Sequence, residues 1–397
     1  MNGSASGLRI ASVCRLLPSA ANPTAGTFIH NRIAALARRA TVSVLQPIPY
    51  FPLLRPLPAW TPPDGHGELP VTRLPMFYLP GLLKSLDGHW LARSVLPHLR
   101  SLRDSGIVQL IDAHFGYPEG VGCALAAARL GIPYFVTLRG LEVDVLKRPA
   151  VRLKLLSALT GAGGCITVSH SLRRLAIDHG VPESRVRVIP NAVDRGLFQP
   201  GDRMAARLRL GIPADTQLIV SVGHLLSVKR HDLLIRALSG LRPLRPTTLV
   251  IIGGPSYEPA QPEFLRRLAE DMGTGARVVF AGAQRQSSVA EWLRAADVFA
   301  LASDREGCCN AVLEALASGC PVVATDAGDN RHFVRDAVNG YTVKVGDARE
   351  LAVRLRQALT QSWDAQAISS GLEIGDWDSV ALRVLDFFSE CLAERAA

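Results

Sequence analysis

The sequence predicts an α/β fold made of two doubly wound, Rossmann-like domains that face each other across a cleft. Short apolar runs rich in β-branched residues alternate with segments of helical period, and this alternation occurs in both halves of the chain. At 397 residues the chain is also too long for one ordinary core. Open parallel sheets bind ligands at the carboxyl ends of their strands, so we expect a site with residues from both halves.

The first half shows the alternation in order. The expected strands are Leu8–Cys14, Thr41–Leu45, Val108–His114, Tyr134–Arg139, Gly164–Ser169 and Val186–Pro190. The expected helices are Phe28–Arg39, Leu91–Arg103, Val121–Leu130, Val151–Leu159 and Ser171–His179. The proline-rich stretch from Pro47 to Pro80 breaks any regular pattern, which predicts a long irregular loop.

The second half repeats the scheme. Its expected strands are Leu218–Gly223, Leu249–Gly253, Val278–Ala281, Val298–Ser303, Val322–Thr325 and Tyr341–Val345. Its expected helices are His231–Leu238, Glu263–Met272, Val289–Ala296, Asn310–Ser318, Arg331–Ala337 and Glu350–Leu359. Gly196, Pro200 and Gly201 mark a boundary. We therefore expect domains over 1–195 and 196–375, and a final helical segment over 376–397 that packs back on the first domain.

Charge and cysteine content narrow the choice of partners and compartment. Residues 1–195 carry 22 basic against 11 acidic side chains, whereas the rest of the chain is nearly neutral. A basic half favours an anionic membrane surface or a phosphate-bearing substrate, and no nucleic-acid motif accompanies it. The seven cysteines show no metal-binding spacing, which favours reduced thiols and no zinc. Without a signal peptide or a membrane-spanning apolar run, we expect a cytoplasmic protein, peripheral at most on the inner face of the membrane.

The strongest motif lies where an expected strand gives way to a helix. Glu306 follows strand Val298–Ser303, and Glu314 lies one turn after Asn310 on the next helix. Carboxylates at such a place suit sugar and ribose hydroxyls, because they would repel phosphate. Taken singly, Asn310 is more simply a helix N-cap and Glu314 a solvated carboxylate.

This segment, which continues into Ala-Ser-Gly-Cys-Pro-Val-Val-Ala-Thr325, resembles the donor-binding motif of glycosyltransferase family 4. These are retaining transferases of the GT-B fold, with two glutamates eight positions apart. The resemblance implies that Glu306 contacts the donor sugar and Glu314 the ribose. It covers nearly the whole chain and is strongest from Val188 to Val345.

A second motif, Val220-Ser-Val-Gly-His224-Leu-Leu-Ser-Val-Lys229, resembles the family's diphosphate-binding segment. Lys229 matches the family lysine, whereas His224 stands where arginine is usual and Arg230 where glycine is usual. A lysine between a strand and a helix can neutralise a phosphate as a point charge, although alone it is more often a surface lysine. We expect Lys229, His224 and Arg230 at the donor. His332 replaces the family glutamate of a later loop, which bears on the choice of donor.

Three residues of the first half complete the candidate site. Gly26 precedes a helix and resembles the family's glycine loop near the donor phosphates. His114 ends a strand, as the family's active-site histidine does, although a structural histidine is an equal alternative. Arg139 replaces a family histidine and could bind an acceptor phosphate bidentately.

The resemblance implies a retaining transferase that moves a hexose-type sugar from a UDP- or GDP-linked donor, with no metal and no cofactor. The basic residues Lys147, Arg148, Arg152 and Lys154 favour a lipid-linked or surface-polysaccharide glycan acceptor at an anionic membrane. A soluble small-molecule acceptor is the alternative. A non-catalytic nucleotide-sugar-binding protein of the same fold is another, favoured by His224 and His332.

Overall fold

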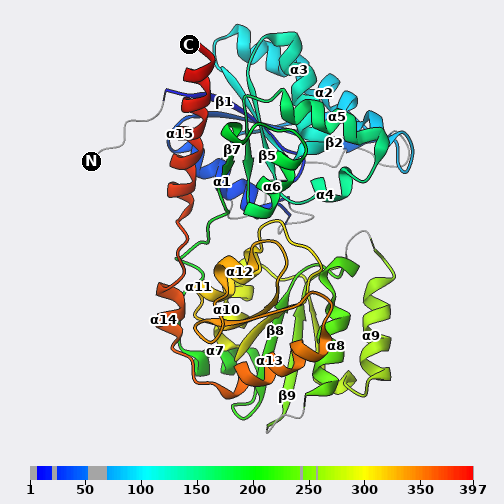
Figure 1. Cartoon of the computed structure of the whole chain (residues 1–397), viewed down its shortest axis with the longest axis vertical. Helices are drawn as coiled ribbons and strands as arrows, with labels where there is room; N and C mark the ends of the chain where they lie inside the picture. Colours follow the sequence, from blue (N-terminus) through cyan, green and yellow to red (C-terminus); the bar gives the residue numbers. More distant parts are fainter. Residues whose placement is uncertain (1–6, 20–24, 52–68, 242–244, 256–257, 397) are drawn as a thin grey trace. The chain divides into compact units, whose positions relative to one another are not determined.

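The computed structural model describes residues 7–19, 25–51, 69–241, 245–255 and 258–396. The chain forms two compact α/β units (Figure 1). The first unit comprises Met1–Ala192 and Trp377–Ala397, and the second comprises Val193–Asp376. The chain therefore leaves the first unit after Ala192, close to the boundary expected at 195, and its last helix returns to that unit.

The first unit contains a seven-stranded sheet in the order β3-β2-β1-β4-β5-β6-β7, with parallel pairing. The strands are β1 (Arg9–Val13), β2 (Thr41–Tyr50), β3 (Val71–Phe77), β4 (Leu110–His114), β5 (Tyr134–Leu138), β6 (Gly164–Thr167) and β7 (Val186–Val188). The helices are α1 (Thr27–Ala37), α2 (Asp87–Asp104), α3 (Val121–Leu130), α4 (Glu142–Val145), α5 (Pro149–Thr160), α6 (His170–Asp178) and α15 (Trp377–Ala396).

Alternating side chains of the strands supply two separate cores. Ile10 of β1 packs with α1 and α15, whereas the next residue, Ala11, packs with α2, α3 and α5 on the opposite face. On the α15 side, the rings of Phe387 and Phe388 lie 6.2 and 4.4 Å from that of Phe135. The final helix is thus part of the core of the first unit.

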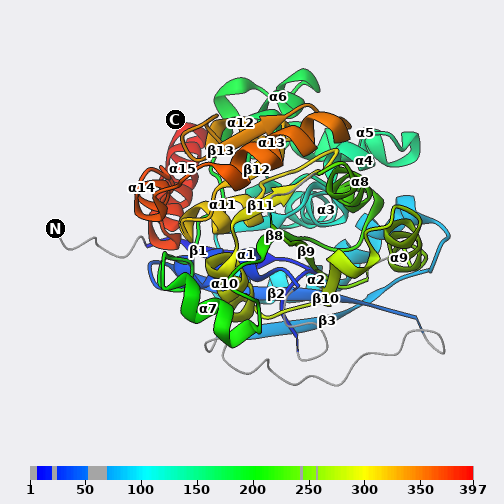
Figure 2. The same ribbon diagram turned by 90° about the horizontal axis from the view of Figure 1, so that it is seen from below.

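The second unit contains a six-stranded parallel sheet in the order β10-β9-β8-β11-β12-β13. The strands are β8 (Gln217–Val222), β9 (Thr247–Ile252), β10 (Val278–Gly282), β11 (Val298–Leu301), β12 (Val322–Thr325) and β13 (Gly340–Val343). The helices are α7 (Arg203–Leu210), α8 (His231–Gly240), α9 (Gln261–Asp271), α10 (Gln286–Ala295), α11 (Asn310–Ala317), α12 (Asn330–Phe333), α13 (Ala348–Thr360) and α14 (Ala365–Ser370). Helix α7, which the sequence did not predict, lies beside α10 (Figure 2).

The prediction of irregular structure throughout Pro47–Pro80 was wrong at both ends of that stretch. Strand β2 continues to Tyr50, and β3 occupies Val71–Phe77. Only Thr41–Leu45 of β2 pairs with β1, so the part that contains Pro47 and Pro49 has a ladder with β3 alone. Because β3 is an edge strand, its Pro75 is tolerated as well. The middle of the stretch, 52–68, lies outside the described residues.

The predicted helix Arg331–Ala337 was also too long, because α12 ends at Phe333. Asn339 supplies the reason, since its side chain donates to the Phe333 carbonyl and accepts from the Arg335 amide. These bonds favour a turn that leads into β13 instead of a continued helix. Within the described residues, no helix is long and apolar enough to span a bilayer.

Candidate functional site

The sheet order of the second unit reverses between β8 and β11, which is the place where such sheets bind ligands. The chain leaving β8 carries Lys229, and the chain leaving β11 carries Glu306. The Lys229 Nζ lies 2.6 Å from the Glu306 Oε1, and the two side chains are 22% and 8% exposed. Burial disfavours the ammonium, but the neighbouring carboxylate holds the pKa of Lys229 above its usual value. The structure therefore brings two predicted donor residues together as a charged pair.

The loop after β12 closes against the Glu306 loop. Gly328 has a φ of +62°, and a Cβ there would lie 2.7 Å from the backbone oxygen of Glu306. Only glycine suits both this conformation and this approach. Consecutive strand ends thus hold Glu306 in a defined position.

Glu314 is a half-buried carboxyl on α11. Burial raises its pKa to about 8, so the group is largely protonated at neutral pH. A hydroxyl that donates to the ionised form would offset this desolvation. The arrangement is therefore suited to a ligand with hydroxyl groups.

The N-cap interpretation of Asn310 was wrong. The structure places Cys309 at the N-cap, without a side-chain capping bond, and Asn310 is the first residue of α11. The amides of Val312 and Leu313 both bond to the Cys309 carbonyl. The donor-contact role of Asn310 stays a prediction.

Arg230 is already occupied by carboxylates that the sequence analysis missed. Its Nε and Nη2 bond to Asp232 at 3.0 and 3.1 Å, and its Nη1 bonds to Asp304 at 3.0 Å. Arg230 also adopts a φ of 49°, a left-handed conformation that explains why glycine suits this position. A donor phosphate would have to compete with both aspartates for its charge. His224 is exposed near the start of the same loop, two residues after β8.

The equivalent reversal in the first unit lies between β1 and β4, and His114 is there. Its Nδ1 lies 3.1 Å from the Arg139 Nη2, and its Nε2 lies 2.8 Å from the Ser12 Oγ. A guanidinium only donates, so Nδ1 accepts and Nε2 carries the proton that is donated to Ser12. Burial, with the charges of Arg32 and Arg139, holds the pKa of His114 well below its ordinary value. His114 is therefore a neutral imidazole with a fixed tautomer.

Neither His114 nor Arg139 is freely exposed. His114 has no exposed surface, and Arg139 also donates to the Asn191 side chain at 3.1 Å. A direct catalytic contact of His114 would require the residues that bury it to move aside, so that role stays a prediction. The Arg139 loop is held by Glu142, whose carboxylate accepts from the amides of Arg139 and Gly140 at 3.1 and 2.8 Å.

A buried ion pair between α1 and β4 lies next to His114 and Arg139 and helps to hold them in place. Arg32 of α1 bonds to Asp112 of β4 at 3.1 Å and to the Thr137 hydroxyl at 2.8 Å. Gly26 caps the same helix with a φ of +64°, and a Cβ there would overlap the backbone oxygen of Leu16. Gly26 thus fixes the start of α1, whereas its predicted contact with the donor stays a prediction.

Comparison with known proteins identifies the family. The chain matches the models for "Glycosyl transferase 4-like domain" over residues 24–192 and "Glycosyl transferases group 1" over residues 202–370. D-inositol 3-phosphate glycosyltransferase from Acidothermus cellulolyticus is 30% identical over 314 residues, which cover 74% of this chain and 70% of the relative. The corresponding protein of Nocardioides sp. is 30% identical over 329 residues, or 76% and 71%. The chain belongs to the group 1 glycosyltransferases, and it is a transferase.

Solved structures share the two-domain architecture. A sucrose-phosphate synthase from Thermosynechococcus elongatus matches with a TM-score of 0.78 at 21% identity, over 98% of this chain and 100% of that one. Anabaena HepE in complex with UDP and glucose matches with a TM-score of 0.74 at 21% identity, over 96% and 100%. The GT-B fold predicted from the sequence is confirmed. The cleft expected between the two domains stays a prediction.

Proposed function

We propose that the chain is a retaining glycosyltransferase that takes a hexose from a nucleotide diphosphate donor bound at the β8–β11 reversal. The Lys229–Glu306 pair carries this proposal, because it sets a cation for a diphosphate beside a carboxylate for sugar hydroxyls. Glu314 lies on α11, the helix that follows the Glu306 loop, and its carboxyl suits the ribose hydroxyls. UDP is our first choice of nucleotide, since HepE was solved with UDP and with UDP-glucose.

In this mechanism the donor separates the two charges of the pair. Lys229 turns to the diphosphate and stabilises the charge that develops as the bond from the sugar C1 to the phosphate oxygen breaks. Glu306 accepts hydrogen bonds from the sugar and orients it. The acceptor hydroxyl attacks C1 on the face that the phosphate leaves, and its proton passes to the departing phosphate oxygen. No residue of the chain forms a covalent intermediate, and no metal is required.

In the first unit, His114 acts through Arg139 in this proposal. The imidazole fixes one edge of the guanidinium, and Asn191 fixes another. A guanidinium held in one orientation can bind an anionic acceptor group bidentately. His114 is then a positioning residue, although the sequence suggested direct catalysis.

For the acceptor, we propose a lipid-linked glycan intermediate at an anionic membrane. Leu83 and Leu153 are 60% and 76% exposed, and the Lys154 ammonium donates to the Ser85 carbonyl at 2.6 Å, which joins the two leucine segments into one surface. Exposed leucines beside cationic side chains suit the boundary between headgroups and acyl chains. The neighbouring basic residues are Lys147, Arg148 and Arg152.

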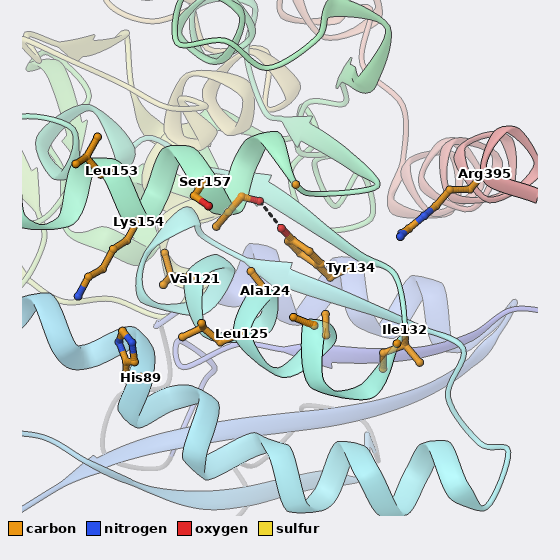
Figure 3. A pocket seen from close by; sticks show the side chains of 15 residues that line it. His89, Val121, Ala124, Leu125, Ile132, Tyr134, Leu153, Lys154, Ser157 and Arg395 are labelled. Atoms are coloured by element: carbon orange, nitrogen blue, oxygen red, sulfur yellow. Dashed lines mark hydrogen bonds between the residues drawn. The ribbon is translucent and has the colours of Figure 1, made fainter.

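A groove beside this surface supports the same partner. It has a volume of about 820 Å³ and runs between α3 and α5. Figure 3 shows apolar side chains such as Val121 and Leu125 along it, with Lys154 and His89 at one end and Arg395 at the other. An apolar channel with cationic ends suits a lipid chain that carries a phosphate.

A soluble phosphorylated acceptor is the second candidate, favoured by relatives named as D-inositol 3-phosphate glycosyltransferases. The orientation of Arg139 suits a phosphate on either kind of acceptor. A measurement of membrane binding distinguishes the lipid-linked acceptor from the soluble one.

The donor proposal is tested by thermal unfolding with UDP, GDP, ADP and their sugars. A ligand that binds only the folded state raises the melting temperature, and we expect the largest rise with a UDP sugar. Lys229→Ala should remove most of that rise, whereas Arg267→Ala, on the exposed face of α9, should preserve it. If no nucleotide stabilises the wild type, or if Lys229→Ala behaves like Arg267→Ala, the donor proposal is wrong.

Flotation with vesicles that contain anionic phospholipid tests the membrane partner. The variant Lys147→Gln, Arg148→Gln, Arg152→Gln should float less than the wild type. A control, Arg9→Gln, Arg174→Gln, Arg185→Gln, loses the same charge from exposed positions elsewhere on the first unit. Equal flotation of the two variants contradicts the membrane proposal and leaves the soluble acceptor.

A further inference from the structure

The second unit has a polar cavity at the end of its sheet that lies away from Lys229 and Glu306. It has a volume of about 630 Å³, and we call it the basal pocket. Gln217 begins β8, Asp297 immediately precedes β11, and Pro321 precedes β12, so the pocket lies at the amino ends of these strands. The donor residues follow the carboxyl ends of the same strands. The basal pocket is thus separate from the proposed donor site.

Positive charge predominates in the basal pocket. Among its described lining residues, Asp297 is the one carboxylate, and the cationic side chains are Arg203, Arg207, Arg245 and Arg294. Asp297 is bonded to both Arg203 and Arg207. A single acid therefore serves two guanidiniums, and the others need different partners.

Two of the arginines are held by the protein itself. Arg207 is buried and donates to the carbonyls of Ala295 and Thr216 at 3.0 and 2.9 Å. Arg294 donates to the Gln199 carbonyl at 3.1 Å and lies 3.4 Å from a Glu291 carboxylate oxygen. Arg207 and Arg294 thus fix the walls of the pocket and contribute positive potential, while their N–H groups already donate to protein oxygens.

Arg203 and Arg245 are the two that remain partly available. Arg203 has a side chain that is 47% exposed despite its bond to Asp297, and Arg245 is exposed. In the described part of the chain, no carboxylate is bonded to Arg245. Arg203 and Arg245 line the same pocket, and burial together with the nearby charge of Arg245 lowers the pKa of Arg203. The two like charges therefore disfavour each other. A bound anion would relieve that repulsion.

We propose that the basal pocket binds the phosphate group of a small metabolite, free or esterified, between Arg203 and Arg245. Guanidiniums match phosphate oxygens in geometry and retain their charge at all physiological pH values. The volume is that of a small-molecule site, and the exposed Ser362 adds a hydroxyl group to its lining. The pocket would hold this ligand without occupying the donor site.

The test uses calorimetric titration of the full chain with inorganic phosphate and with glucose 6-phosphate, at constant ionic strength. The titrations are made in a background of Lys229→Ala and Arg139→Gln, so that phosphate binding at the proposed donor site and at Arg139 does not contribute. We expect one saturable site, which Arg245→Gln weakens at least tenfold and Arg245→Lys, which keeps the charge but not the planar fork, weakens less. Arg236→Gln, an exposed arginine of α8, is the matched control and should change nothing.

The two probes distinguish the source of the phosphate group. Tighter binding of glucose 6-phosphate assigns the pocket to a phosphate ester, and equal binding assigns it to the free ion. Absence of saturable binding in this background overturns the proposal, as does an effect of Arg236→Gln equal to that of Arg245→Gln. Unliganded melting temperatures verify that each variant folds.

Discussion

At the scale of single residues, the candidate donor site combines a carboxylate that is paired with a lysine and a carboxyl whose ionisation is disfavoured by burial. Glu306 lies 2.6 Å from an ammonium group, whereas burial raises the pKa of Glu314 to about 8. Two carboxyls of one motif therefore lie in different environments, and burial disfavours the ionised form of Glu314. The difference makes the proposed ribose contact sensitive to pH.

We expect the affinity for UDP to rise with pH between 6 and 8. Ribose hydroxyls donate to the ionised Glu314, so binding must first remove the proton that the free protein holds below pH 8. The gain approaches about tenfold per pH unit if the bound carboxyl is fully ionised. Calorimetric titration from pH 6 to 9 measures it. Glu314→Gln should bind more weakly at pH 8 and show a flat profile, and a wild-type profile equally flat would contradict the ribose role.

The same carboxyl affects folding. Between pH 4.5 and about 8 the folded protein holds a proton on Glu314 that the unfolded chain releases. The free energy of unfolding therefore falls as pH rises through this window. Glu314→Gln removes this contribution, so its stability should decline less than that of the wild type in urea titrations at pH 5 and pH 8. Parallel declines in the two proteins would argue against a raised pKa.

At the scale of elements, glycines decide how loops join helices. Gly26 and Gly131 flank helices α1 and α3, with φ angles of +64° and +67°. A Cβ at Gly26 would overlap the Leu16 backbone, whereas a Cβ at Gly131 would meet open space. Substitutions at these two glycines therefore distinguish the cost of backbone strain from the cost of steric overlap.

We expect Gly131→Ala to cost about 1 kcal/mol, which is the penalty of a left-handed conformation for a residue with a side chain. Gly26→Ala should cost clearly more, because the Leu16 backbone must also move. Urea denaturation measures both. Equal costs would mean that the approach to Leu16 contributes nothing.

At the scale of the whole molecule, the two ends of the chain form one unit. Phe388 is fully buried against Phe135, although 253 positions separate them in the sequence. The second unit is inserted between these parts of the first. Loss of the contact should therefore weaken the first unit and spare the donor site.

We expect Phe388→Ala to destabilise the first unit by roughly 3–5 kcal/mol through the cavity it leaves. The exposed Leu382→Ala, on the same helix, should cost less than about 1 kcal/mol. Calorimetric melting with and without UDP separates the units, because the rise caused by UDP should persist in Phe388→Ala. Disappearance of that rise would mean that the two units do not melt independently.

The sequence by itself determined the alternation of strands and helices, which depends on local spacing, since a strand, its loop and the next helix are consecutive in the chain. Its resemblance to a known family implied the GT-B fold and the choice of Lys229, Glu306 and Glu314 as candidate donor residues. Strand β3 was missed because its proline, Pro75, is tolerated only by virtue of the strand's place at the sheet edge.

Only the tertiary structure decided which residues meet across long separations. Arg230 pairs with Asp304, 74 positions away, and His114 is enclosed by Ser12 and Arg139. Burial, tautomer and counter-ions depend on neighbours from other strands, and spacing along the chain does not encode them. The basal pocket was invisible in the sequence for the same reason, because its arginines converge only when the amino ends of the strands lie side by side.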